Sequence, residues 1–140
     1  MERLARGHDA RTTGRAALKA PDGRAAPVRH AFEVRHPTWL GPEALALLRA
    51  FDVALVAADT AGKHPESLER TASFAYVRLH GATTLYAGRY EDRALAAWAA
   101  RALDWAADGN DVFIYFDNDA EADAPRDAIR LRALVERPRG

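Results

Sequence analysis

The amino-acid sequence predicts an α/β fold with parallel strands, on three observations. Segments with the apolar pattern of β-strands alternate with amphipathic segments of helical periodicity over residues 30–135. The segment 53–59, VALVAAD, is apolar up to its last residue, which is typical of a strand buried on both faces of a parallel sheet. Polar side chains follow each strand segment, where parallel folds gather ligand-binding groups. We therefore expect right-handed βαβ units, with the helices on one face.

The individual elements follow from local patterns. The predicted strands lie near 30–36, 53–59, 74–80 and 112–117. The predicted helices cover 42–51, 91–107 and 125–135. Pro42 suits a first helical turn, and Gly109 ends the long central helix, whose Leu95, Trp98 and Trp105 share one face. Four such strands are compatible with half of an eight-stranded barrel or with a small open sheet.

Residues 1–29 differ from the rest in composition. They hold glycine, proline and scattered arginine, and we interpret them as a helix remnant followed by a basic linker. Residues 1–30 carry seven basic and three acidic groups, and the remainder is correspondingly acidic. A basic segment could contact phosphate, but a solvated linker is the simpler interpretation.

Composition argues against several classes of protein. The formal net charge is zero, so there is no global electrostatic reason to expect binding to nucleic acid or to an anionic membrane. The chain has no cysteine, which excludes disulfides and thiolate metal sites. No secretory signal and no membrane-length apolar run is recognisable. By default we expect a cytoplasmic protein without a membrane partner.

The alternation of side chains along strands predicts where a site would form. Glu33 and Arg35 share one face of the first strand, and Arg78 and His80 share one face of the third. We expect Arg35, Asp59, Arg78 and His80 to point to the side of the sheet opposite the helices. For the fourth strand the pattern leaves two alternatives, in which either Tyr115 and Asp117 or Phe116 and Asn118 point inward.

These residue types suggest acid–base or anion-binding chemistry. Glu33 or Asp59 could act as a general base with His80 as a proton shuttle, and Arg35 and Arg78 could hold a carboxylate or phosphate. The alternative is a structural network of ion pairs. His36 and His80 lack metal-site spacing, so no metal is expected. Three aromatic residues near strand ends could stack on sugar or base rings, or only pack loops: Trp39, Tyr86 and Tyr90.

Four ordered motifs carry a family resemblance: HAFEVRHPTWL, VALVAADTA, TASFAYVRLHGATTLYAGRY and DVFIYFDNDAEADAPRDAIRL. Over residues 28–135 the chain resembles the C-terminal half of the DUF72 (YecE-like) family. The resemblance implies a TIM-barrel-like (β/α) fold truncated to about its last four βα units, with the domain spanning 30–136. It implies site residues at the barrel mouth, namely Glu33, Arg35, His36, Trp39, Asp59, Arg78, His80, Gly81, Tyr86, Tyr90, Phe116, Asn118 and Asp119.

The functional expectation is a barrel-mouth site for a small polar ligand, sugar-like or phosphate-like, that is incomplete in this chain. The resemblance supplies no reaction and no cofactor. The alternatives are a non-catalytic binding module, conceivably for nucleic acid, and an inactive gene fragment. A four-strand half barrel has two unpaired sheet edges, so we expect the chain to self-associate when it is expressed alone.

Overall fold

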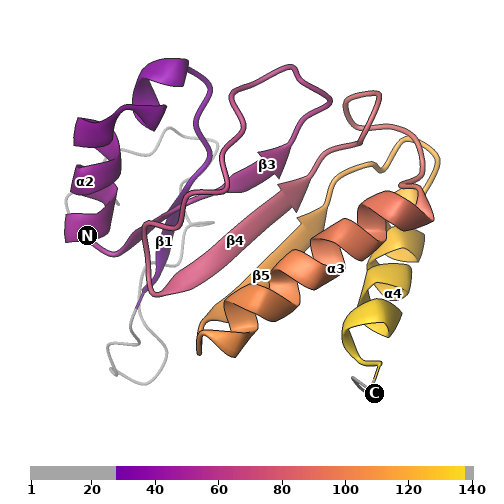
Figure 1. The fold of residues 1–140 in the computed structure, drawn as a ribbon. Helices are drawn as coiled ribbons and strands as arrows, with labels where there is room; N and C mark the ends of the chain where they lie inside the picture. The colour runs from indigo at the N-terminus through magenta and orange to yellow at the C-terminus, as the bar shows by residue number, and fades with distance from the viewer. Residues whose placement is uncertain (1–27, 138–140) are drawn as a thin grey trace, which may run out of the picture.

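The computed structural model describes residues 28–137, which form an α/β domain with one curved layer of strands and one layer of helices (Figure 1). The strands are β1 (His30–Phe32), β2 (Val53–Leu55), β3 (Ala57–Asp59), β4 (Phe74–Leu79) and β5 (Asp111–Phe116). The helices are the 3-10 turn η2 (Pro37–Leu40), α2 (Pro42–Ala50), α3 (Asp92–Ala107) and α4 (Asp123–Val135). The expected N-terminal helix remnant lies outside the described residues.

All strand pairs among the described residues are parallel and follow chain order. β1 pairs with β2, β3 pairs with β4, and β4 pairs with β5. Only Val56 separates β2 from β3, and its N–H donates to the Phe32 carbonyl at 2.9 Å. The segment 53–59 is therefore one strand path that pairs first with β1 and then with β4. The prediction of consecutive parallel strands is confirmed, whereas residues 28–137 form an open sheet and no closed barrel.

The helices pack on the convex face of the sheet, as predicted. Val77 and Leu79 of β4 are fully buried against Leu95 and Trp98 of α3. A smaller cluster, centred on Leu48 of α2, packs beside β2. On each strand, these apolar residues alternate with residues that point to the other side of the sheet. The alternate residues are therefore not covered by the helices.

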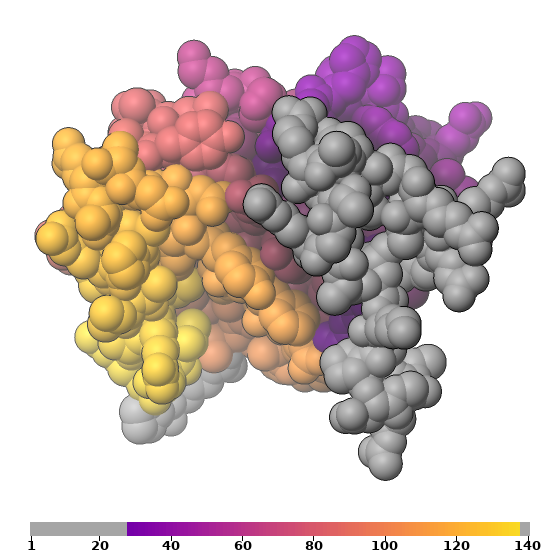
Figure 2. Space-filling model, turned by 180° about the vertical axis from the view of Figure 1, so that it is seen from behind, coloured from indigo at the N-terminus to yellow at the C-terminus, as the bar shows by residue number. Residues whose placement is uncertain are grey.

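The concave face of the sheet is open. Phe113 and Tyr115 of β5 keep 36% and 49% of their surface exposed, although both are large aromatic residues within a strand. Figure 2 views the molecule from behind and shows β4 and β5 recessed on this side. Within the described part of the chain, no helix is long and apolar enough to cross a membrane.

Candidate functional site

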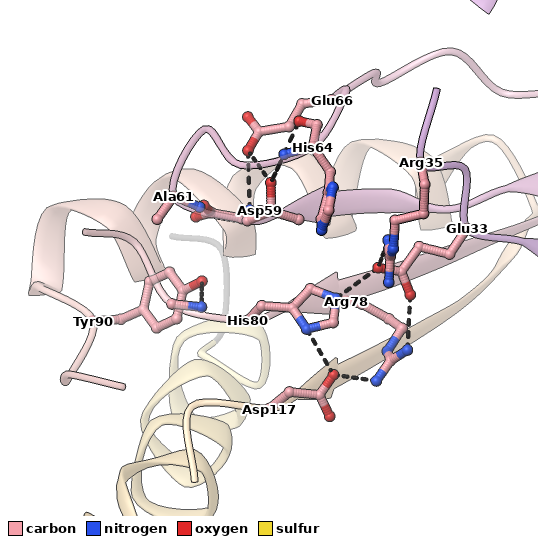
Figure 3. Close-up of polar contacts among 12 residues, drawn as sticks. Glu33, Arg35, Asp59, Ala61, His64, Glu66, Arg78, His80, Tyr90 and Asp117 are labelled. Carbon is pink, nitrogen blue, oxygen red and sulfur yellow. Dashed lines mark hydrogen bonds and ion pairs between the residues drawn. The ribbon is translucent and has the colours of Figure 1, made fainter. Parts of the chain in front are cut away.

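Five ionisable side chains meet on the concave face, at the carboxyl ends of β1, β4 and β5 (Figure 3). Glu33 and Arg35 follow β1, Arg78 lies within β4 and His80 follows it, and Asp117 follows β5. We call this group the concave cluster. Because parallel strands end at the same edge of a sheet, residues far apart in the chain come together here. The sequence prediction that Arg35, Arg78 and His80 share this side is met.

Glu33 is the centre of the concave cluster. Its Oε1 accepts hydrogen bonds from Arg35 Nη1 at 2.6 Å and from His80 Nε2 at 2.7 Å. Its Oε2 accepts one from Arg78 Nη1 at 2.7 Å. One carboxylate thus binds side chains from two strands, and these charge-assisted bonds are stronger than neutral ones.

Arg78 and His80 connect Glu33 to the last strand. Arg78 Nη2 donates to Asp117 Oδ2, so one guanidinium bridges two carboxylates. The Nδ1 of His80 lies 3.1 Å from the same oxygen, but outside hydrogen-bonding geometry. These contacts decide between the two alternatives for the fourth predicted strand, because they place Tyr115 and Asp117 on the concave face. Asp117 was missing from the predicted site residues because parity alone could not choose between the two faces.

The concave cluster holds Glu33 in its ionised form. Burial alone would raise the pKa of Glu33, but hydrogen bonds from Arg35 and His80, with the charges of His80 and Arg78, lower it below its ordinary value. The Glu33 side chain is only 11% exposed, whereas that of Arg35 is 46% exposed. The carboxylate is therefore a fixed anchor, and the solvent-facing guanidinium is the part a ligand would meet first.

An aromatic hollow of about 410 Å³ adjoins the concave cluster. Tyr76 and Tyr115 stack with their ring centroids 5.1 Å apart, and Phe113 packs beside Tyr76. Glu33 and Arg78 line the same hollow. The sequence alone leaves Tyr115 as one of two alternatives and does not single out Tyr76 or Phe113, although Tyr76 shares the parity of Arg78, and Phe113 and Tyr115 share the parity of Asp117.

The charges around the hollow are balanced. Arg29 donates to Asp111 Oδ2 at 2.6 Å, and its guanidinium lies over the rings of Phe74 and Phe113. Arg35 and Arg78 are paired with Glu33 and Asp117. Each arginine that lines this face within the described residues therefore already has a carboxylate partner, and the hollow carries no surplus positive charge from arginine.

A tight loop closes over His80. The ring of Tyr86 meets that of His80 edge to face at a centroid distance of 5.4 Å. Gly81 has φ of +130°, and a Cβ there would lie 2.1 Å from the Thr84 carbonyl oxygen. His80 is 1% exposed, so this loop shields it from solution. Tyr86 itself is half exposed.

The structure does not bring Asp59 into the concave cluster. Asp59 pairs in register with Leu79, and both lie on the helix-facing parity. Its carboxyl group lines a separate hollow with Trp98 and Arg101. Burial, with a smaller effect of the neighbouring Glu66, raises its pKa. The expectation that Asp59 would point away from the helices is therefore wrong, because the strand ends at the helix-facing position.

Tyr90 and Asn118, two further predicted site residues, belong to a buried network with Asp127 and Arg130. We call these four residues the C-terminal latch. Asp127 Oδ2 accepts from the Tyr90 N–H at 2.8 Å and from Asn118 Nδ2 at 2.9 Å. Arg130 Nη1 donates to Asp127 Oδ1 at 2.5 Å. The Tyr90 hydroxyl accepts from the Gly81 N–H at 3.0 Å. The structure places Tyr90 and Asn118 on the helix side, away from the hollow.

The remaining candidates lie outside the concave cluster. His36 caps the 3-10 turn, since the Thr38 N–H donates to its Nδ1 at 3.4 Å. Trp39 packs against Phe32 at a ring distance of 5.8 Å. Asp119 is exposed in the loop before α4, and Phe116 packs against Tyr90 on the helix side. Among residues 28–137, no group of three or more potential metal ligands comes together.

Comparison with known proteins gives a consistent result. The family model described as "Protein of unknown function DUF72" matches residues 8–140. A DUF72 family protein from Thermotoga maritima matches with a TM-score of 0.72 at 21% identity, over 79% of this chain and 47% of that one. A second, from Enterococcus faecalis, matches with a TM-score of 0.71 at 17% identity, over 81% of this chain and 49% of that one. The chain thus spans about half the length of these solved structures. No curated protein matches it.

Proposed function

The chain belongs to the DUF72 family, and from that premise we propose that the concave face binds a small, uncharged, polyhydroxylated ligand of the sugar class. The observation that carries the proposal is the contact between the aromatic hollow and the concave cluster. Tyr76, Phe113 and Tyr115 offer flat apolar surface, while Glu33 and Arg78 offer hydrogen-bonding groups at its edge. A sugar ring presents the matching pattern of C–H faces and hydroxyl edges.

The balance of charge favours a neutral ligand over a phosphate. Arg29, Arg35 and Arg78 are each paired with a carboxylate of the chain. A phosphate dianion would have to displace Glu33 or Asp111 from an existing ion pair and would meet the negative charge it left behind. Hydroxyl groups need no such exchange, because they can donate to a carboxylate and accept from a guanidinium at once.

The geometry favours binding over proton transfer. A general base works best when its pKa lies near the working pH, whereas hydrogen bonds from Arg35 and His80 hold the pKa of Glu33 low. His80 is enclosed by the loop around Tyr86 and does not reach the hollow's surface. Both residues therefore serve to position Arg78 and Arg35 rather than to react.

Saturation-transfer NMR with D-glucose, D-xylose, D-ribose, glucose 6-phosphate and inorganic phosphate tests the proposal. We expect transfer to the C–H protons of at least one neutral sugar and its loss in Tyr115→Ala. Phe51→Ala is the matched control, because Phe51 is an exposed aromatic residue at the end of α2, outside the hollow. Binding of phosphate without any neutral sugar would overturn the proposal. Unchanged binding in Tyr115→Ala would place the ligand elsewhere.

A further inference from the structure

The aromatic hollow extends along the strands, well beyond the concave cluster. On β1 and its flanking residues, the lining side chains alternate from Arg29 through Ala31 to Glu33. On β4 they alternate in the same way from Phe74 to Arg78. Because Phe74 and Arg78 are four residues apart within one strand, and a strand rises about 3.3 Å per residue, the hollow is about 13 Å long.

Both ends of the hollow carry hydrogen-bonding groups. At the carboxyl ends of the strands, Glu33 and Arg78 belong to the concave cluster (Figure 3). At the amino ends, Asp111 pairs in register with Phe74, and Arg29 Nη1 donates to Asp111 Oδ2 at 2.6 Å. The side chains of Arg29 and Asp111 remain 47% and 63% exposed. A guanidinium has five N–H donors, so Arg29 keeps donors for a ligand while it holds Asp111.

The middle of the hollow is apolar. Ala31 and Val56 line it with small side chains, and Tyr76 lies two residues from each end of the β4 row. The ring of Phe113 lies 6.3 Å from that of Tyr76. A pyranose ring is about as large as one aromatic ring, so a single sugar ring cannot contact both polar ends of the hollow. A ligand that uses both ends must be longer than a monosaccharide.

We propose that the ligand of this hollow is a linear oligosaccharide of at least two linked rings, which lies along the strands. One ring lies against Tyr76 and places hydroxyl groups at Glu33 and Arg78. The next ring lies toward the amino ends of the strands and places hydroxyl groups at Arg29 and Asp111. Both ion pairs stay intact, because hydroxyl groups donate to a carboxylate and accept from a guanidinium at once. This inference rests on the proposed function, since it names the class of sugar that the same hollow binds.

Dissociation constants for sugars of increasing length test the proposal. NMR titration of the ¹⁵N-labelled chain measures them for xylose, xylobiose and xylotriose, for glucose, cellobiose and cellotriose, and for glucose, maltose and maltotriose. In at least one series we expect affinity to rise about tenfold or more with length, since the longer sugar adds contacts at the second polar end. If monosaccharides bind and longer sugars bind no more tightly, the oligosaccharide proposal is overturned and the proposed function stands. If no sugar of any length binds, both are overturned.

Arg29→Gln tests whether the ligand reaches the amino end of the hollow. The readout is the ratio of the monosaccharide to the trisaccharide dissociation constant, which partial unfolding leaves unchanged because it affects both titrations equally. We expect this ratio to fall several-fold in Arg29→Gln. Arg49→Gln is the matched control, because Arg49 pairs with Glu69 at 2.6 Å and is 48% exposed outside the hollow, and it should keep the wild-type ratio. An unchanged ratio in Arg29→Gln would overturn the proposal.

Discussion

The concave cluster and the C-terminal latch are built from similar residues and do different work. Both bring carboxylates and arginines to the carboxyl ends of β4 and β5. In the latch, Asp127 is fully buried and its carboxylate accepts hydrogen bonds from Tyr90, Asn118 and Arg130. In the concave cluster, the side chains of Arg35 and Arg78 keep 46% and 35% of their surface exposed beside an open hollow. One network is buried against the helices, whereas the other is accessible from a hollow, and this difference in exposure is why we propose a ligand site only for the concave cluster.

The largest effect is expected in the latch. Asp127→Ala removes the shared acceptor and leaves the Tyr90 N–H, the Asn118 amide and the Arg130 guanidinium without their partner. Removing one member of a buried charged pair costs about 3–5 kcal/mol of unfolding free energy. Urea denaturation followed by circular dichroism measures it. Asp119→Ala, in the exposed loop before α4, is the control and should change stability by less than about 0.5 kcal/mol. A loss below about 1 kcal/mol in Asp127→Ala would contradict the structural role of the latch.

A smaller loss of stability is expected at the centre of the concave cluster. Glu33→Gln keeps the shape of the side chain but removes the charge that Arg35, Arg78 and His80 contact. Water can reach the two arginines, so the loss of unfolding free energy should be about 1.5–3 kcal/mol, the range for hydrogen bonds to charged groups. The same denaturation measurement applies. If Glu33→Gln proves as destabilising as Asp127→Ala, the distinction between the two networks fails.

The stabilising effect of Glu33 should depend on pH. Its pKa is lower in the folded state, so its contribution is present above its unfolded-state pKa and is lost as the pH falls through the folded value. The stability difference between the wild type and Glu33→Gln should therefore be full at neutral pH and shrink on acidification. Denaturation curves from neutral pH to about pH 3 measure this difference. A difference that stays constant over that range would contradict the ionised anchor.

The smallest effect is expected at Asp59, with the opposite sign. Burial raises the pKa of Asp59 in the folded state. The contribution of Asp59 to the free energy of unfolding is therefore fully present at low pH, where the carboxyl group is protonated, and is lost as the pH rises through the pKa of the folded state. Asp59→Asn removes the cost of a half-buried charge and should raise Tm slightly at neutral pH. The gain should disappear under acidic conditions, and differential scanning calorimetry at both pH values shows whether it does.

Much of the architecture could be predicted from local patterns. The apolar segment 53–59 and the amphipathic segment that forms α3 are long enough for periodicity to fix their type. The prediction of parallel strands in chain order follows from their alternation, and the structure agrees. The sequence could not predict whether the sheet closes into a barrel, because the pattern of four strand paths is the same in an open sheet and in part of a barrel.

The site was harder to predict because it depends on which face each side chain occupies. Arg78 and His80 were placed correctly, since the alternate Val77 and Leu79 are plainly apolar. Asp59 was misplaced because Ala57 and Ala58 give no contrast between the two faces. In β5, five apolar residues in succession (VFIYF) hide the parity, which is why the sequence leaves Asp117 as one of two alternatives and does not predict the aromatic hollow. The face that each of these side chains occupies is fixed by the pairing between strands, which cannot be read from any single segment of the sequence.

Site-resolved NMR tests the central claim most directly. The claim is that the concave cluster and its aromatic hollow bind a ligand, whereas the latch holds the fold. Titration of the ¹⁵N-labelled chain with the sugar that gives the strongest saturation transfer should shift the backbone amides of Tyr76, Arg78 and Tyr115. The amides of Asp127 and Arg130 should stay in place. Shifts confined to the latch, or spread evenly over α3 and α4, would contradict the account.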